Sequence, residues 1–182
     1  MKILGIDPGL YGACAVWWGD PKELYVYGFE QFEAHKGRGM ELDGRAMADQ
    51  FNIAFRGVDF AFIEDVNAHP GEGASSAFKF GTTFGIALGM LYTLGIPFDF
   101  VLPSKWVPEI VGSKMKTAEE VGKKPDKSRN MAKATNIFPA YSNLFKGTKE
   151  GGSQSKKLAE GKADAALIAY YGYCVKTGRR FR

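Results

Sequence analysis

The sequence predicts an α/β fold in which a mixed sheet carries helices on both of its faces. Three short apolar runs near the start are spaced like strands joined by hairpins, and the rest of the chain alternates helical periodicity with two further apolar runs. This order is typical of antiparallel strands followed by parallel strands with helical connections. At 182 residues and 45% hydrophobic content, the chain can bury the core of one domain, so we expect residues 1–182 to form a single domain.

The first three strands are predicted from local composition and turns. Residues 2–7 form an apolar run that ends on Asp7, and a Pro8-Gly9 turn leads into a second run over residues 12–18. Residues 24–29 make the third strand. Asp7 therefore lies where the first strand meets its turn.

The remaining elements follow from spacing. Leu42, Met47, Phe51 and Phe55 recur at helical intervals, and residues 58–63 form a short apolar strand that stops at Glu64. Further along, we expect an apolar helix over 74–94, a fifth strand over 97–102, and helices over 127–136 and 158–175. Glu64, like Asp7, therefore stands at the end of a strand.

The helix over 74–94 carries glycines at intervals of four, at Gly81, Gly85 and Gly89. Glycine weakens a helix, so this bare face predicts close packing by another element. We expect that element to be the sheet of the same chain, ahead of the equivalent helix of a second subunit.

Charge divides the chain into unlike halves. Residues 1–100 hold 7 Lys and Arg against 13 Asp and Glu, whereas residues 101–182 hold 17 against 7. The acidic half could bind metal ions and the basic half a polyanion. The simpler alternative is that the basic stretches, which include predicted flexible loops at 113–126 and 146–156, are only solvated.

Other classes of protein are disfavoured by composition. The start of the chain lacks a long apolar run after Lys2, and no segment has the apolar length of a membrane span. Cys14 and Cys174 are too few for a disulfide framework or a zinc site, and we expect both to be core thiols in a reducing cytoplasm.

Four acids are candidates for chemistry. Glu160 and Asp164 lie on one face of the last helix, and Asp164 has apolar neighbours among which an unpaired carboxylate is costly. Together with Asp7 and Glu64 they would form an all-oxygen cluster suited to Mg²⁺ or Mn²⁺. Taken singly, Asp7 could be a turn residue, Glu64 an exposed strand end and Asp164 a salt-bridge partner.

Four motifs in register resemble those of the RuvC-type Holliday junction resolvases. They are Gly5-Ile6-Asp7-Pro8-Gly9, the Ile63-Glu64 strand end followed by the helix that contains Ser75 to Gly81 and Gly85, Pro125-Asp126-Lys127-Ser128, and Ala163-Asp164-Ala165-Ala166. The resemblance spans most of the chain. It implies a ribonuclease H-like fold, a homodimer, and Mg²⁺-dependent nicking of four-way DNA junctions.

The resemblance also implies roles for individual residues. Asp7, Glu64 and Asp164 match the metal-binding acids, and Lys127 matches a basic residue of the active site. Two Mg²⁺ ions sharing Asp7, with Mn²⁺ able to substitute, would leave 5′-phosphate and 3′-hydroxyl ends. Glu160 would be an auxiliary ligand. The DNA arms would contact a basic face, for which we expect Lys114, Lys116, Lys123, Lys124, Arg129, Lys156 and Lys157.

The chain departs from the family pattern at two places. Gly161 stands where the last helix of the family usually has a further Asp, which leaves Glu160 as the substitute. Val66-Asn67-Ala68-His69 stands where the family often places an aromatic wedge. With the basic insertions, these departures suggest a phage-encoded member in a bacterial cell.

Three alternatives remain. One is a nuclease for other branched DNA or for RNA/DNA hybrids, and another is a branched-DNA-binding protein without catalysis. The third is a phosphotransferase of the actin and sugar-kinase type, which also opens with a Gly-Ile-Asp strand. That fold needs two such lobes, and the motif occurs once here.

Overall fold

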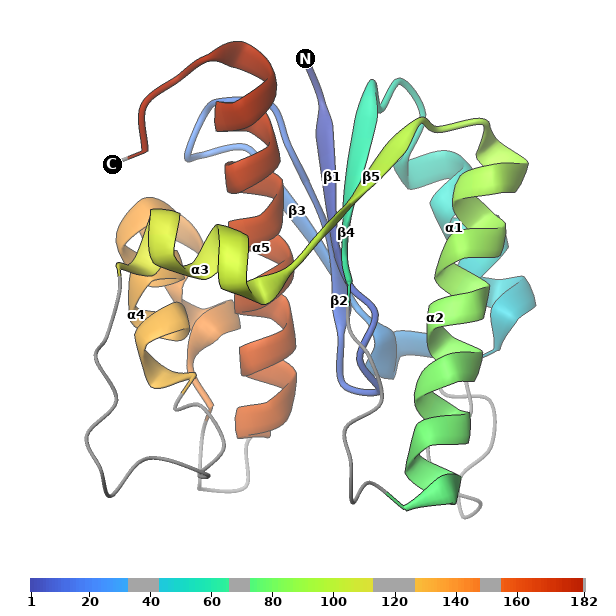
Figure 1. The fold of residues 1–182 in the computed structure, drawn as a ribbon. Helices are drawn as coiled ribbons and strands as arrows, with labels where there is room; N and C mark the ends of the chain where they lie inside the picture. Colours follow the sequence, from blue (N-terminus) through green and yellow to red (C-terminus); the bar gives the residue numbers. More distant parts are fainter. Residues whose placement is uncertain (33–42, 66–72, 113–126, 148–154, 182) are drawn as a thin grey trace.

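A five-stranded sheet runs through the centre of the computed structural model, which describes residues 1–32, 43–65, 73–112, 127–147 and 155–181 (Figure 1). The strand order is β3-β2-β1-β4-β5, with β1–β2 and β2–β3 antiparallel and β1–β4 and β4–β5 parallel. The predicted mixed sheet is confirmed. The strands are β1 (Ile3–Asp7), β2 (Ala13–Trp17), β3 (Leu24–Gly28), β4 (Phe60–Glu64) and β5 (Phe98–Val101).

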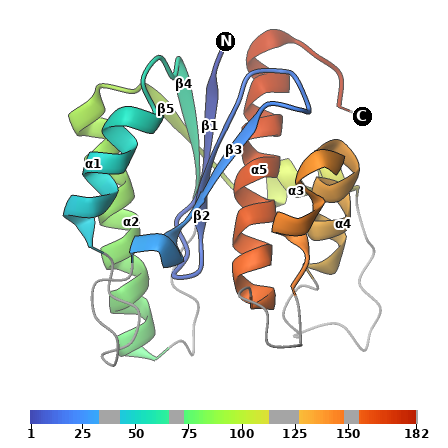
Figure 2. The same ribbon diagram turned by 180° about the vertical axis from the view of Figure 1, so that it is seen from behind.

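Helices cover both faces of the sheet, as Figures 1 and 2 show from opposite sides. One face carries α1 (Gly44–Ala54) and α2 (Ala74–Leu94), and the other carries α3 (Pro103–Val111), α4 (Ser128–Ile137) and α5 (Lys156–Thr177). Two 3₁₀ segments, η1 (Phe29–Phe32) and η3 (Pro139–Phe145), complete the described elements. The predicted helices are confirmed to within two residues at each printed end.

Helix α3 was not expected from the sequence. Pro103 occupies its first turn, where the missing N–H costs nothing, and Trp106 and Ile110 form its buried stripe one turn apart. A second proline, Pro108, lies inside this short helix. Two prolines in nine residues are atypical of a helix, so local composition does not indicate α3.

The alternation of side chains along the strands determines which face the acids occupy. In β1, Leu4 and Ile6 pack in the core beneath α1 and α2, whereas Ile3 packs in the core beneath α5. Asp7 has the parity of Ile3, so its side chain belongs to the α5 face. In β4, Phe62 lies on the α5 face and gives Glu64 the same orientation.

Helix α5 lies close to β1 because Gly5 has no side chain. A Cβ at Gly5 would stand 2.3 Å from both the carbonyl oxygen of Ala165 and the backbone nitrogen of Ala169. The helix backbone therefore rests directly on the strand, and Asp164, the neighbour of Ala165, is brought down to the sheet with a side chain 1% exposed.

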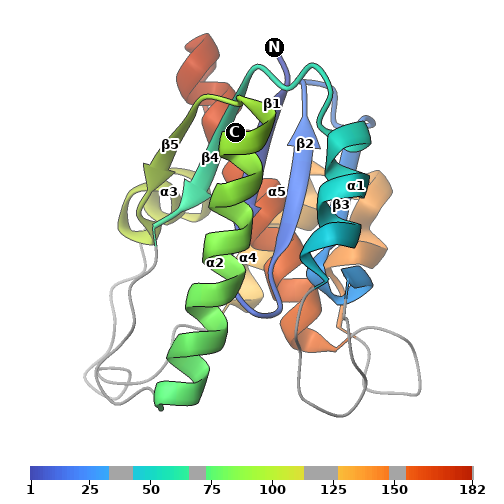
Figure 3. The same ribbon diagram turned by 90° about the vertical axis from the view of Figure 1, so that its right-hand side faces the viewer.

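The expectation that the glycine face of α2 packs on the sheet is wrong. Gly81, Gly85 and Gly89 are exposed, and among the described residues nothing lies within 4 Å of a Cβ built at any of them. Helix α2 contacts the sheet through a different stripe, which includes Thr83, Ala87 and Leu91. Figure 3 shows α2 at the front, with its outer side turned away from the sheet.

Other expectations have simpler outcomes. Cys14 and Cys174 are buried free thiols, as predicted. None of the helices in the described ranges has the length and apolarity to cross a membrane. The loop at 113–126, most of the loop at 146–156, and the Val66-Asn67-Ala68-His69 segment lie outside the described residues.

Candidate active site

Two carboxylates meet at the carboxyl ends of adjacent parallel strands. Asp7 ends β1 and Glu64 ends β4, and the register pairs their predecessors, Ile6 and Ile63. Both are buried, at 7% and 6% exposure. Because both side chains belong to the α5 face, they converge with Asp164, which α5 presents to the same end of the sheet.

Helix α4 supplies two partners for Asp164. The Lys127 ammonium, at the N-terminal cap of α4, donates to Asp164 Oδ2 in a contact that is also an ion pair. The Asn130 amide donates to Asp164 Oδ1 at 2.8 Å. Each oxygen of this carboxylate therefore has its own donor, and the salt-bridge role considered for Asp164 is present.

The turn after Asp7 contributes a backbone donor. The N–H of Gly9 donates to Asp7 Oδ1 at 2.9 Å, and the N–H of Gly12 donates to the carbonyl oxygen of Gly9 at 2.8 Å. Asp7 is thus the turn residue that its Asp-Pro-Gly setting suggests. This hydrogen bond holds the carboxylate at the edge of the acidic cluster.

The electrostatics show that these four groups interact. Burial raises the pKa of Glu64 to about 8, with repulsion from Asp7 and Asp164 added to it. Burial also raises the pKa of Asp7, against the opposing attraction of Lys127. Burial disfavours the charge on Lys127, but the three acids outweigh that effect and raise its pKa. Burial and mutual repulsion therefore oppose the full ionisation of the three acids, and Lys127 offsets this effect only in part.

Glu160 has a different partner. It lies on α5 one turn before Asp164, half-buried, and pairs with Lys156 at 3.8 Å. Gly161 packs against the first hairpin, where a Cβ would stand 2.1 Å from the carbonyl oxygen of Tyr11. Gly161 therefore has a packing role, because any side chain at this position would collide with the turn that carries Asp7.

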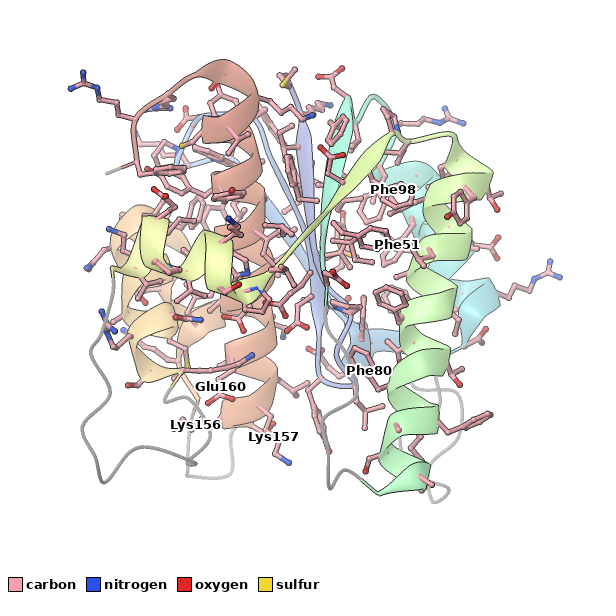
Figure 4. The ribbon with its side chains drawn as sticks, in the orientation of Figure 1. Phe51, Phe80, Phe98, Lys156, Lys157 and Glu160 are labelled. Atoms are coloured by element: carbon pink, nitrogen blue, oxygen red, sulfur yellow. The ribbon has the colours of Figure 1, made fainter. Side chains whose placement is uncertain are left out.

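The predicted DNA-binding residues fall into three groups. Lys114, Lys116, Lys123 and Lys124 lie outside the described residues. Lys156 and Lys157 are exposed at the start of α5, the end of that helix that Figure 4 labels with Glu160. Lys157 lies 5.0 Å from the centroid of the Tyr11 ring. The Arg129 guanidinium instead donates to the carbonyl oxygens of Val111 and Gly112, both at 3.1 Å.

Sequence reasoning missed two residues of the site, Trp106 and Asn130. The Trp106 indole N–H donates to Glu64 Oε1 at 3.0 Å, and both side chains are buried. A signal for Asn130 was available, since it lies three residues after Lys127 and so faces the same side of α4. Trp106 had no comparable signal, because its helix was not expected.

The donor set fits a divalent cation. Within the described ranges, no three His, Cys, Asp or Glu side chains are already arranged around a metal position, and Lys127 and Asn130 occupy the oxygens of Asp164. The chemistry nevertheless matches, because three buried carboxyl groups supply hard oxygen ligands, and a divalent cation would stabilise their ionised forms. Asp7, Glu64 and Asp164 are the residues that would hold it.

Comparison with known proteins identifies the architecture. A structure of Thermus thermophilus RuvC is 19% identical, with 98% of each chain covered and a TM-score of 0.53. The chain has the fold of RuvC. A T. thermophilus RuvC structure in complex with a Holliday junction substrate is 18% identical, covers 98% of this chain and 97% of that one, and has a TM-score of 0.55. No protein-family model and no curated protein sequence matches the chain.

The RuvC fold agrees with the sheet that the motifs implied, a ribonuclease H-like arrangement of three antiparallel strands continued by parallel ones. At sequence identities of 18% and 19%, these comparisons establish only the fold. The chemistry of this chain must therefore be argued from its own residues.

Proposed function

We propose that this protein is a Mg²⁺-dependent endonuclease that nicks four-way DNA junctions, acting as a homodimer in the bacterial cytoplasm. The observation that carries the proposal is the convergence of Asp7, Glu64 and Asp164 with Lys127 at one end of a RuvC-fold sheet. One solved structure with this fold is a complex with a Holliday junction substrate, which makes branched DNA the first substrate to test.

Each residue of the cluster has a role in the proposed reaction. Asp7 is the shared metal ligand, Glu64 and Asp164 are the outer ligands, and Glu160 is an auxiliary one. A metal held by these residues would supply Lewis-acid activation of a water and of the leaving 3′ oxygen, and the expected products are 5′-phosphate and 3′-hydroxyl ends. Mn²⁺ is expected to replace Mg²⁺, since both take oxygen ligands.

Lys127 is the cationic residue of the site. Its ammonium is held among three carboxylates, which keep it protonated. On substrate binding, we expect this charge to stabilise the negative charge that builds up on the scissile phosphate. Lys127 is accordingly a catalytic residue in this proposal.

A basic surface beside the cluster supports DNA binding. Lys156 and Lys157 project from the start of α5, next to the Tyr11 turn that follows Asp7. Contacts from such lysines to phosphates give affinity without reading sequence. We propose the same role for Lys114, Lys116, Lys123 and Lys124, whereas Arg129 serves partly to hold the end of α3.

The bare face of α2 supports the homodimer. Phe78 and Tyr92, 77% and 69% exposed, each lie seven residues from Gly85, about two helical turns, and so share its face. A two-fold axis through Gly85 would therefore pair Phe78 of one protomer with Tyr92 of the other across a close antiparallel helix contact. Gly81 and Gly89 would pair in the same way.

The proposal is tested by Asp7→Asn together with a substrate panel. The variant is expected to bind a four-way junction as the wild type does but to lose nicking by at least about 100-fold, since it loses the shared ligand. Lys22→Gln, a surface change at the opposite end of the sheet, is the control.

The panel compares a four-way junction, a Y-fork, a linear duplex and an RNA/DNA hybrid in Mg²⁺. Symmetric paired nicks in the junction alone support the resolvase. Cleavage of the fork or the hybrid instead would show that the protein is a nuclease for other branched DNA or for RNA/DNA hybrids. Tight junction binding with no cleavage by the wild type in Mg²⁺ or Mn²⁺ leaves a branched-DNA-binding protein.

A further inference from the structure

Two of the three cluster acids accept hydrogen bonds from buried side chains that themselves carry no charge. Glu64 accepts one from the Trp106 indole on α3, and Asp164 accepts one from the Asn130 amide on α4. The donors are 1% and 8% exposed. These partners come from helices that pack on the α5 face of the sheet, far from β4 and α5 in sequence.

The Trp106 contact leaves part of Glu64 free. The indole N–H is a single donor, and it engages only Oε1, at 3.0 Å. A carboxylate held at one oxygen has its rotation fixed, while the lone pairs of the other oxygen stay available. The side chain of Glu64 is thereby oriented at the end of a rigid strand.

The Asn130 amide likewise orients the carboxylate of Asp164, from helix α4. Asn130 Nδ2 holds Oδ1 at 2.8 Å, and Oδ2 is the oxygen that contacts Lys127. The two oxygens of Asp164 thus have separate donors, and the Asn130 contact at Oδ1 does not depend on the Lys127 contact at Oδ2.

We propose that Trp106 and Asn130 are positioning residues that orient the Glu64 and Asp164 carboxylates to bind a divalent cation. This inference rests on the proposed function only in assuming that the acids bind metal. Hydrogen bonds to ligating carboxylates commonly contribute about 10- to 100-fold to metal affinity. Orientation before binding is the physical reason, because the free carboxylate would otherwise lose rotational freedom on binding.

The chain offers a matched control for each residue. Trp17 is as buried as Trp106, and its indole N–H donates at 2.7 Å to the carbonyl oxygen of Asp20, at the opposite end of the sheet. Asn136 lies on α4 as Asn130 does, but is exposed. Trp106→Phe and Trp17→Phe thus remove the same donor from similar cores, and Asn130→Leu and Asn136→Leu make the same change on one helix.

The experiment is calorimetric titration of Mn²⁺ into the full chain without DNA, with thermal unfolding of each variant recorded alongside. Trp106→Phe and Asn130→Leu are expected to raise the Mn²⁺ dissociation constant about 10- to 100-fold. Trp17→Phe and Asn136→Leu are expected to stay within about twofold of the wild type, since neither touches a ligand. Asn130→Gln, which keeps the amide donor, is expected to recover part of the affinity that Asn130→Leu loses.

The inference is overturned if folded Trp106→Phe and Asn130→Leu bind Mn²⁺ as tightly as the wild type, even where their melting temperatures fall. It is also overturned if the wild type binds no Mn²⁺. Because the titration needs no DNA, a wild type that binds Mn²⁺ but nicks no junction contradicts the proposed function alone.

Discussion

The charge of Glu64 depends strongly on its surroundings. Its pKa is raised from 4.5 to about 8, first by burial and then by Asp7 and Asp164. Between these two values the folded protein holds a proton that the unfolded chain releases. The folded state binds more protons there, so without metal the free energy of unfolding falls as pH rises from about 5 to 8.

Glu64→Gln is therefore expected to make the stability of the metal-free protein less dependent on pH. Gln cannot ionise, so the proton linkage at this position disappears, and the variant should be the more stable protein at pH 8. Thermal unfolding in a chelator from pH 5 to 9 measures this, with the exposed Glu109→Gln as control. Equal pH slopes for wild type and Glu64→Gln would show that Glu64 ionises normally.

At position 161, packing conflicts with the ligand that the family pattern suggests. The resemblance to resolvases suggests that an Asp at this position would restore a missing ligand, but a Cβ would stand 2.1 Å from the Tyr11 carbonyl. Because backbone atoms on both sides are fixed by packing, this overlap cannot be relieved by a rotamer change.

Gly161→Asp is accordingly expected to destabilise the fold by about 1 to 3 kcal/mol and to bring no gain in Mn²⁺ affinity. Gly73→Asp is the control, since nothing described lies within 4 Å of its Cβ position and Asp is favoured at that helix cap. Chemical denaturation gives the stability and calorimetry the affinity. A stable Gly161→Asp with tighter Mn²⁺ binding would contradict the packing role.

At the scale of elements, α2 and α5 use glycine in opposite ways. On α5, Gly161 brings the helix against the first hairpin, while Gly5 of β1 brings the same helix onto the sheet. On α2, the three glycines face away from the described residues. The cost of glycine to a helix is offset within the chain in the first case, and by a second protomer in our proposal for the second.

Gly85→Leu tests the α2 contact. The side chain has open space in the protomer, so the fold should be kept, but it blocks close approach of a second helix. We expect sedimentation to show a monomer, or a dimer weakened at least about 10-fold, with an unchanged or higher melting temperature of the protomer. Asn136→Leu, exposed on α4, is the control. A dimer that persists in Gly85→Leu would place the interface elsewhere.

In the whole molecule, the fold places acidic residues of the first half of the chain beside basic residues of the second half. The acidic first half supplies Asp7 and Glu64 from strand ends, and the basic second half supplies Lys127 and the lysines at the start of α5. The folded chain brings the two halves together at one end of the sheet. A polyanion attracted by the basic half would thus meet the acids that hold the metal.

Salt dependence measures that attraction. The double variant Lys156→Gln with Lys157→Gln, in an Asp7→Asn background, is expected to lower the slope of log K against log salt by up to about 2 for a four-way junction. Lys22→Gln, which lies at the opposite end of the sheet, should leave the slope unchanged. Fluorescence anisotropy over a range of salt gives the slopes, and equal slopes would exclude phosphate contacts by these two lysines.

Local sequence patterns predicted the five strands, the helices α1, α2, α4 and α5, and the candidate acids, but not α3. The signals are local. Asp7 and Glu64 each end an apolar run, and Asp164 is a carboxylate within an apolar stretch of helix, so each is recognised without knowing which other segment it contacts. Alternation along each strand follows from backbone geometry, but the observed core packing was needed to place Asp7 and Glu64 on the same face.

The hydrogen-bond partners of these acids depend on the tertiary fold. Trp106 contacts Glu64 across 42 residues of chain, and Asn130 contacts Asp164 across 34, so the sequence does not show either pairing directly. Only the spacing of Asn130 from Lys127 offers an indirect signal. Gly161 and the α2 glycines look alike in sequence, yet one is packed against backbone and the others are exposed. Local patterns report how a segment folds, whereas donors, close approaches and exposed faces depend on which segments the fold brings together.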